Sequence, residues 1–189
     1  MTAIPSILQS ASDGDPWALA QIIGVFAKLK GIGAAKEALK GDEAAATGGF
    51  KPFKSTDTEY ANEIKSYPGL EQVDLTIFGH PKPYQRAELT AQFTNGDLLI
   101  KFYTTDVRGQ QIGTELISNA IELAGVNNVK TVSGSFGKSN LQAYNDLISS
   151  GRTATEAAWG TPLGKSMQLM GFKTVEISHG ALPQFKFGY

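Results

Sequence analysis

The sequence predicts an α+β fold in which helices flank a mixed central sheet, with a helical extension at the N-terminus. Three observations indicate this fold class. Apolar and polar residues alternate over 71–104, as in consecutive antiparallel strands. A glycine-containing turn then leads into 112–124, where apolar side chains recur at helical spacing. Strands and helices follow, and a right-handed crossover through the central helix predicts a parallel strand pair.

Composition indicates a globular domain plus an extension. The chain has 189 residues, of which 41% are hydrophobic, enough to bury a sizeable core. A formal net charge of -1 argues against general nucleic-acid binding. The absence of cysteine excludes disulfides and thiolate chemistry, and two histidines do not favour a metal site. No signal peptide or membrane-spanning run is evident, so the expected site of action is the cytoplasm.

Residues 1–50 form the predicted extension to a domain over 51–189. Asp15 and Pro16 are suited to begin a helix, whose apolar stripe consists of Leu19, Ile22, Ile23, Phe26 and Leu29. Residues 44–49 are rich in alanine and glycine and indicate a flexible joint. Two interpretations stay open for the extension: a helical hairpin packed on the domain, or a segment for targeting or partner binding.

The first elements of the domain are a helix and three strands. Residues 58–67 are predicted to be a helix that Pro68-Gly69 ends. Strands follow at 72–77, 86–93 and 97–104, and the third is expected to place Leu98, Ile100 and Phe102 on one face. Asn95-Gly96 between the last two strands predicts a hairpin with a two-residue turn. That turn pairs Thr94 with Asp97, Phe93 with Leu98, and Ala91 with Ile100.

The second half of the domain alternates helices and strands. Residues 129–136 predict a strand parallel to 97–104. Helices are expected at 139–148 and 163–170, with a polar connection at 151–160 between them. The chain then ends in two expected strands, at 172–177 and 184–187.

The segment Val107-Arg-Gly-Gln-Gln-Ile-Gly-Thr114 resembles the pyrophosphate-binding turn of the GNAT acetyltransferase superfamily. In that family the pattern Arg/Gln-x-x-Gly-x-Gly/Ala opens the central helix. Arg108 and Gly113 match it, and Gln111 stands at its first glycine. The order of elements over 58–178 also resembles the family. The ending at 164–172 resembles its closing Tyr-x-x-x-Gly-Phe helix, with Met167 at the tyrosine position.

The resemblance implies a site for acetyl-CoA as co-substrate. The expected cofactor-binding residues are Val107, Arg108, Gly109, Gln110, Gln111, Ile112, Gly113, Thr114 and Asn140. Methionine cannot donate a proton, so Tyr144, in a segment that resembles the family's Asn-x-x-Ala, is the expected acid for the leaving thiolate. Glu88, on the polar face of its strand, and His179, in a loop, are the expected bases.

Two functions stay open. The first is an N-acyltransferase that moves an acetyl group to an amine of a protein or an aminoacyl-tRNA. The alanine- and glycine-rich extension before a compact domain resembles the C-terminal modules of bacterial polymorphic toxins. This resemblance implies that the protein is an effector delivered as part of a secreted protein, and that an immunity protein is its partner. The second is a GNAT-like fold with changed chemistry, either a non-catalytic binding module or a ribonuclease toxin. A ribonuclease would use the basic residues Lys130, Lys138, Arg152, Lys165 and Lys173.

Overall fold

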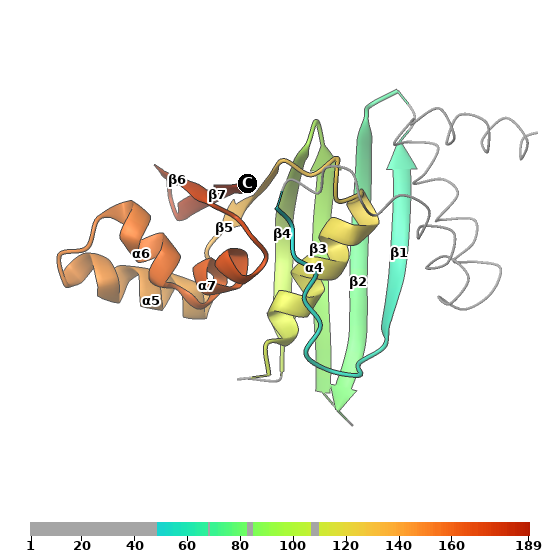
Figure 1. The fold of residues 1–189 in the computed structure, drawn as a ribbon, viewed down its shortest axis with the longest axis horizontal. Coiled ribbons are helices and arrows are strands. Elements are labelled where there is room, and N and C mark those ends of the chain that lie inside the picture. The colour runs from blue at the N-terminus through green and yellow to red at the C-terminus, as the bar shows by residue number, and fades with distance from the viewer. Residues whose placement is uncertain (1–48, 68, 83–84, 107–109) are drawn as a thin grey trace, which may run out of the picture.

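The computed structural model describes residues 49–67, 69–82, 85–106 and 110–189 (Figure 1). The predicted N-terminal helix and most of the joint at 44–49 lie outside these residues. The described part is an α+β fold with a seven-stranded mixed sheet and four helices, which confirms the predicted fold class. None of its helices is long and apolar enough to cross a membrane.

The sheet has the strand order β1-β2-β3-β4-β5-β7-β6. The strands are β1 (Tyr60–Tyr67), β2 (Gln72–Lys82), β3 (Gln85–Thr94), β4 (Asp97–Thr105), β5 (Thr131–Ser135), β6 (Thr174–His179) and β7 (Pro183–Gly188). The first four strands form an antiparallel meander, β4 and β5 are parallel, and β5, β7 and β6 are antiparallel. The crossover from β4 to β5 runs through α4 (Ile112–Ala124), as the sequence predicts.

One face of the sheet carries the hydrophobic core. The register places on this face a row of fully buried side chains, Leu75, Leu89, Leu98, Val132 and Phe187. Helix α4 packs on β2, β3 and β4, and α5 (Lys138–Ser149), α6 (Ala154–Gly160) and α7 (Pro162–Leu169) gather beside it near β5, β7 and β6 (Figure 1). Trp159 of α6 lies against Phe187, with ring centroids 5.0 Å apart. We call the opposite face the open face, since no described helix covers it.

Residues 60–67 form a strand, so the helix predicted over 58–67 is wrong. Tyr60 and Ile64 are four residues apart, which fits a helix, but both also fit the strict alternation of a strand. β1 pairs with β2 along its whole length, from Tyr60↔Gly79 to Tyr67↔Gln72. A short isolated helix is only marginally stable, so continuous pairing with a neighbouring strand decides the structure of this segment.

The hairpin between β3 and β4 has the predicted turn and register. Asn95 and Gly96 adopt φ values of 52° and 84°, and all three predicted residue pairs occur. The register then shifts, because Thr90 and Ala91 face Phe102 and Ile100, which leaves Lys101 as the extra residue of a β-bulge. Because of this extra residue, the side chains of β4 after Lys101 lie on the opposite face of the sheet from the one that strict alternation predicts. Phe102 therefore lies on the open face, 50% exposed, and not beside Ile100 as predicted.

Residues 154–160 form α6, where the sequence analysis predicts a polar connection. Thr153 caps this helix. Its hydroxyl accepts a hydrogen bond from the Glu156 backbone N–H, and its own N–H donates to the Glu156 carboxylate at 2.9 Å. This reciprocal capping box satisfies two donors at once and allows a helix of only seven residues. The predicted helices at 139–148 and 163–170 and the last two strands are confirmed.

Candidate active site

The parallel strands β4 and β5 pair only where they begin. Their register runs from Asp97↔Thr131 to Ile100↔Gly134, whereas β4 continues to Thr105. The bulge at Lys101 comes directly after the last pair. From there β4 diverges from β5, and no described strand pairs with this edge of β4. Backbone N–H and C=O groups on an unpaired edge are available to another extended chain.

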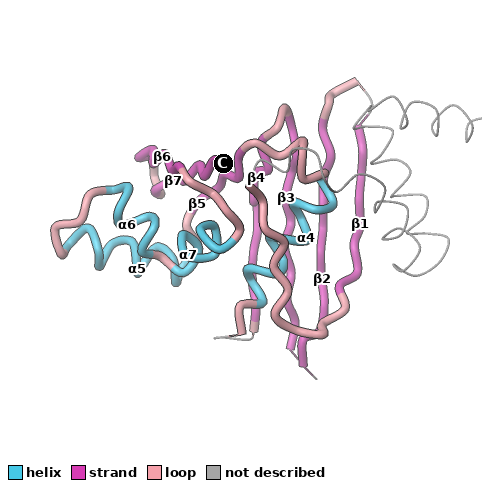
Figure 2. The backbone as a smooth tube through the Cα atoms, in the orientation of Figure 1, coloured by secondary structure: helices cyan, strands magenta, loops and turns pink. Residues whose placement is uncertain are grey.

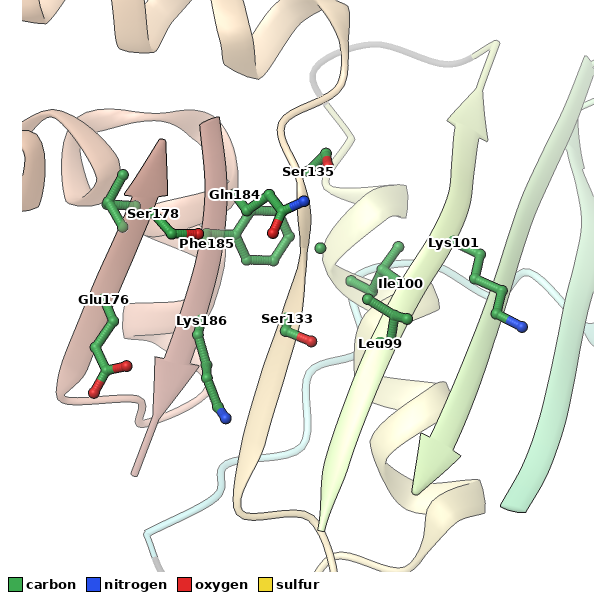
Figure 3. A pocket seen from close by; sticks show the side chains of 12 residues that line it. Leu99, Ile100, Lys101, Ser133, Ser135, Glu176, Ser178, Gln184, Phe185 and Lys186 are labelled. Carbon is green, nitrogen blue, oxygen red and sulfur yellow. The ribbon is translucent and has the colours of Figure 1, made fainter. Parts of the chain in front are cut away.

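A cleft of about 570 Å³ opens on the sheet at this divergence (Figure 3). Leu99, Ile100 and Phe185 supply its apolar lining. Hydroxyl and amide groups come from β5, β6 and β7, in Ser133, Ser135, Ser178 and Gln184, and charged groups come from Glu176 and Lys186. Lys101 also belongs to the lining, but its ammonium lies 3.9 Å from Asp74 of β2 and its side chain points away from the cleft (Figure 3). This volume lies within the range of small-molecule sites, and polar side chains outnumber apolar ones in the lining.

Asp97 ties the paired ends of β4 and β5 together. One of its carboxylate oxygens accepts a hydrogen bond from the Thr131 hydroxyl and the other from the Ser133 hydroxyl, each at 2.5 Å. Hydrogen bonds to an ionised carboxylate are short and strong. They fasten the first residues of β4 to β5, so the two strands are tied together at one end and diverge at the other.

The first turn of α4 follows the diverging end of β4. Gln111 precedes the helix with φ 56° and ψ 20°, in the left-handed region that favours glycine. The N–H groups of Thr114 and Glu115 both donate to the Gln111 carbonyl. The N–H groups that open a helix have no partner within it, and the helix dipole makes this end attractive to anions.

Tyr103 packs against this first turn. It lies on the core face of β4, and a Cβ atom added to Gly113 would fall 1.7 Å from its Oη and 2.6 Å from its Cζ. Burial raises the pKa of the Tyr103 phenol. Gly113 is therefore required for close packing between the tyrosine and the helix.

Glu115 of α4 holds the segment before β1 against this helix. Figures 1 and 2 show the segment passing over α4. The carboxylate is buried. It accepts hydrogen bonds from the backbone N–H groups of Ser55 and Thr56, from the Thr56 hydroxyl at 2.8 Å and from the Tyr60 hydroxyl at 2.8 Å. Burial alone would raise the pKa of Glu115, but these bonds, led by those from Thr56, lower it below its usual value.

The same segment contacts the turn before α4. The Ser55 hydroxyl donates to the Gln110 carbonyl at 2.9 Å, and the Phe53 N–H donates to the Ser118 hydroxyl at 2.9 Å. Burial, and then the bond to Glu115, raise the pKa of Tyr60, so its phenol stays protonated as the donor. The beginning of the described chain thus contacts Gln110, which lies directly before Gln111 and α4.

Tyr144, the predicted acid, is not among the residues that line the cleft. It is buried in α5 and stacks on Phe136 with centroids 5.1 Å apart, and Phe136 lies 5.2 Å from Phe185 of the cleft. Burial raises the pKa of Tyr144, and its hydroxyl has no hydrogen-bond partner within the described chain. The Phe136 ring therefore lies between Tyr144 and Phe185 of the cleft lining.

Asn140 and Thr114 join helices to one another. The Asn140 side-chain oxygen accepts from the Leu163 N–H at 2.8 Å, which satisfies a donor at the start of α7. The Thr114 hydroxyl is 2.7 Å from the Ser166 hydroxyl of α7. Both predicted contacts to the cofactor are engaged in helix packing.

The two predicted bases lie at different places on the sheet. Glu88 is half-buried on the open face of β3, opposite Phe78 of β2 and Thr104 of β4. It is thus one strand away from the unpaired edge of β4. His179 is exposed at the end of the outermost strand β6. The structure brings Glu88, and not His179, next to the diverging end of β4.

The remaining predicted residues are Val107, Arg108 and Gly109, which lie outside the described residues, Gln110, which is exposed, and Ile112, whose side chain is buried in the core under α4. The basic residues of the ribonuclease alternative come from several elements: Lys130 precedes β5, Lys138 and Arg152 lie at the two ends of α5, Lys165 lies in α7, and Lys173 precedes β6. Arg152 lies 3.9 Å from Glu156. Sequence reasoning missed the bulge at Lys101 and the cleft residues of β5. Gly134 was the sequence signal for the cleft residues of β5, since a glycine inside a strand marks a place where another backbone or a ligand approaches closely.

Comparison with models of known protein families gives no match, and no curated protein matches this sequence. Function is therefore inferred from the fold and the geometry of the site.

Proposed function

We propose that the protein is an N-acyltransferase with a GNAT-like fold that transfers an acetyl group from acetyl-CoA to an amine. The observation that carries the proposal is the divergence of the parallel strands β4 and β5 at the Lys101 bulge, which opens a cleft there. The pantetheine arm of coenzyme A is an extended chain with two amides. It can pair with the unpaired edge of β4 as an added strand would.

The first turn of α4 supports the same proposal. The helix is the next element after β4 in the chain, and a pyrophosphate at its first N–H groups would continue from a pantetheine arm beside β4. Gln111 differs from the glycine of the GNAT pattern, yet its backbone adopts the left-handed conformation that glycine favours. Gln111 thus has a backbone conformation that a glycine at this position would also adopt readily.

The order of elements also agrees with the resemblance from the central helix onward. A strand, a helix, a parallel strand, further helices and two antiparallel strands follow one another from β4 to β7. The first element of the matched region differs, because residues 60–67 form β1 and not a helix. The likeness is therefore strongest in the part of the fold that contains the cleft.

The chemistry requires a base for the amine and a donor for the thioester oxygen. Backbone N–H groups on the unpaired edge of β4 after Lys101 are suited to polarise the carbonyl. Glu88 lies one strand away, opposite Thr104 of β4, and is suited to act as the base for the amine. Phe136 separates Tyr144 from the cleft lining. We therefore infer that the proton for the leaving thiolate comes from the amine nitrogen through solvent, and not from Tyr144.

Titration calorimetry with acetyl-CoA tests the proposal. The protein is expected to bind acetyl-CoA, and Ser135→Trp is expected to weaken binding at least about tenfold, equivalent to 1.4 kcal/mol, because an indole would fill the cleft. Ser135 is exposed at the cleft wall, so the variant leaves the core intact. Thr76→Trp, on the open face of β2, is the matched control and should bind normally.

Two results would contradict the proposal. One is the absence of acetyl-CoA binding to the unmodified protein at high micromolar concentration. The other is equal affinity of the unmodified protein and Ser135→Trp, since the nucleotide would then bind outside the cleft.

A further inference from the structure

We infer that the acyl acceptor is a small amino-acid-like zwitterion, bound on the open face with its ammonium on Glu88 and its carboxylate on Arg86. The inference rests on the proposed function for the transfer step. Binding of the acceptor itself needs no acetyl-CoA, so the two can be tested separately.

A second hollow of the sheet contains both charged residues. Its volume is about 260 Å³, and it is lined by Phe78, Gly79 and His80 of β2 and by Arg86, Ala87 and Glu88 of β3. Pockets for drug-sized ligands span roughly 300–1,000 Å³, so this hollow suits a smaller molecule. Arg86 and Glu88 are two positions apart on the same face of β3, which places their backbones roughly 7 Å from each other.

The two charges are available to a ligand. The ion pairs of the described chain are Lys65–Glu63, Lys101–Asp74 and Arg152–Glu156, and none includes Arg86 or Glu88. The Arg86 backbone N–H donates to Asp106 at 3.0 Å, which fixes the strand without engaging the guanidinium. A guanidinium binds a carboxylate through two parallel hydrogen bonds, and a carboxylate accepts from an ammonium. One zwitterion satisfies both groups.

Two exposed aromatic rings flank Glu88. Phe78 lies directly opposite Glu88 on β2 and is 44% exposed. Phe102 of β4 pairs with Thr90, the next open-face residue of β3 after Glu88, and is 50% exposed. Large apolar side chains grouped on an open sheet face indicate a binding surface. They would cover an apolar side chain of the acceptor and strengthen its ion pairs by excluding water.

The position of Glu88 suits the transfer. Glu88 pairs with Thr104 of β4, whose other edge is the unpaired edge beside the cleft. Glu88 takes one proton from the ammonium. The neutral nitrogen then forms the C–N bond with the thioester carbon as the C–S bond breaks, and the second proton passes from nitrogen to the thiolate. The amide product has no positive charge, so its attraction to Glu88 is lost and release is favoured.

The test measures binding of L-leucine by calorimetry without acetyl-CoA. L-leucine is expected to bind at least about tenfold more tightly than leucine amide, which lacks the carboxylate, or 4-methylpentanoate, which lacks the amine, since each loses a charge-assisted bond. Arg86→Gln should bind L-leucine and leucine amide with equal affinity. Glu88→Gln should bind L-leucine and 4-methylpentanoate with equal affinity. Arg152→Gln and Glu63→Gln are the matched controls, and both should bind L-leucine normally.

Melting temperatures equal to that of the unmodified protein ensure that the variants are folded. The inference is overturned if L-leucine does not bind at millimolar concentration, or if Arg86→Gln and Glu88→Gln bind it unchanged. A parallel titration with acetyl-CoA separates the two proposals. Binding of L-leucine without acetyl-CoA binding would keep this site and remove the acyltransferase, whereas the reverse would remove this site alone.

Discussion

Replacement of Glu115 by alanine is expected to lower the free energy of unfolding by about 4 kcal/mol, which denaturation in urea followed by circular dichroism would measure. The carboxylate is buried and accepts from two backbone N–H groups and the hydroxyls of Thr56 and Tyr60. Its removal leaves these donors without an acceptor and releases the segment before β1 from α4. A loss below about 1 kcal/mol would contradict this account, as such a value is typical of an exposed side chain.

Glu59→Ala is the matched control, because Glu59 is an exposed glutamate in the segment directly before β1. The pH dependence adds a second test. The pKa of Glu115 is lowered in the folded state, so its contribution to stability is complete above the unfolded value of about 4.3 and is lost as the pH falls through the folded value. Glu115→Gln should therefore show a shallower loss of stability on acidification than the unmodified protein.

Substitution of Gly113 by alanine is expected to cost about 3 kcal/mol of unfolding free energy, because the new methyl group would overlap Tyr103. A tyrosine ring is stiff, so the helix or the strand must shift. The double variant Gly113→Ala, Tyr103→Ala should recover about 1–2 kcal/mol relative to the sum of the single variants. Urea denaturation of the four proteins gives this coupling, and strict additivity would show that the two residues do not compete for space.

This overlap matters for experiments on the candidate site. A bulky residue at Gly113, such as tryptophan, would disturb packing as well as any phosphate at the turn. Ser135 is exposed at the cleft wall, so its substitution tests ligand binding without that effect.

The sequence predicted best where short-range signals agree with one another. Alternation over β2, β3 and β4 and the two-residue turn at Asn95-Gly96 fix the register together, and the predicted pairs occur. The bulge at Lys101 was missed because it appears only when both strands are aligned, and it moves Phe102 to the opposite face. β1 was missed because Tyr60 and Ile64 fit both the helical and the strand period.

The candidate site was predicted less well than the fold. The glycines of the sequence locate the turn before α4, and Gln111 at its end has a left-handed backbone conformation. The sequence predicts Asn140 as a ligand contact, but its side-chain oxygen accepts from the N–H of Leu163, 23 residues further along the chain, a contact that only tertiary structure reveals. Tyr144 was chosen by its place in a motif, and motifs carry no information on whether a side chain is buried behind another.

The most direct test of the acyltransferase account is a titration of the isotope-labelled protein with acetyl-CoA, observed through its backbone amide resonances. The account predicts the largest shifts at residues 101–105 of β4, at 112–114 of α4 and at 134–135 of β5. Shifts confined to other parts of the sheet, or no shifts at saturating acetyl-CoA, would contradict it.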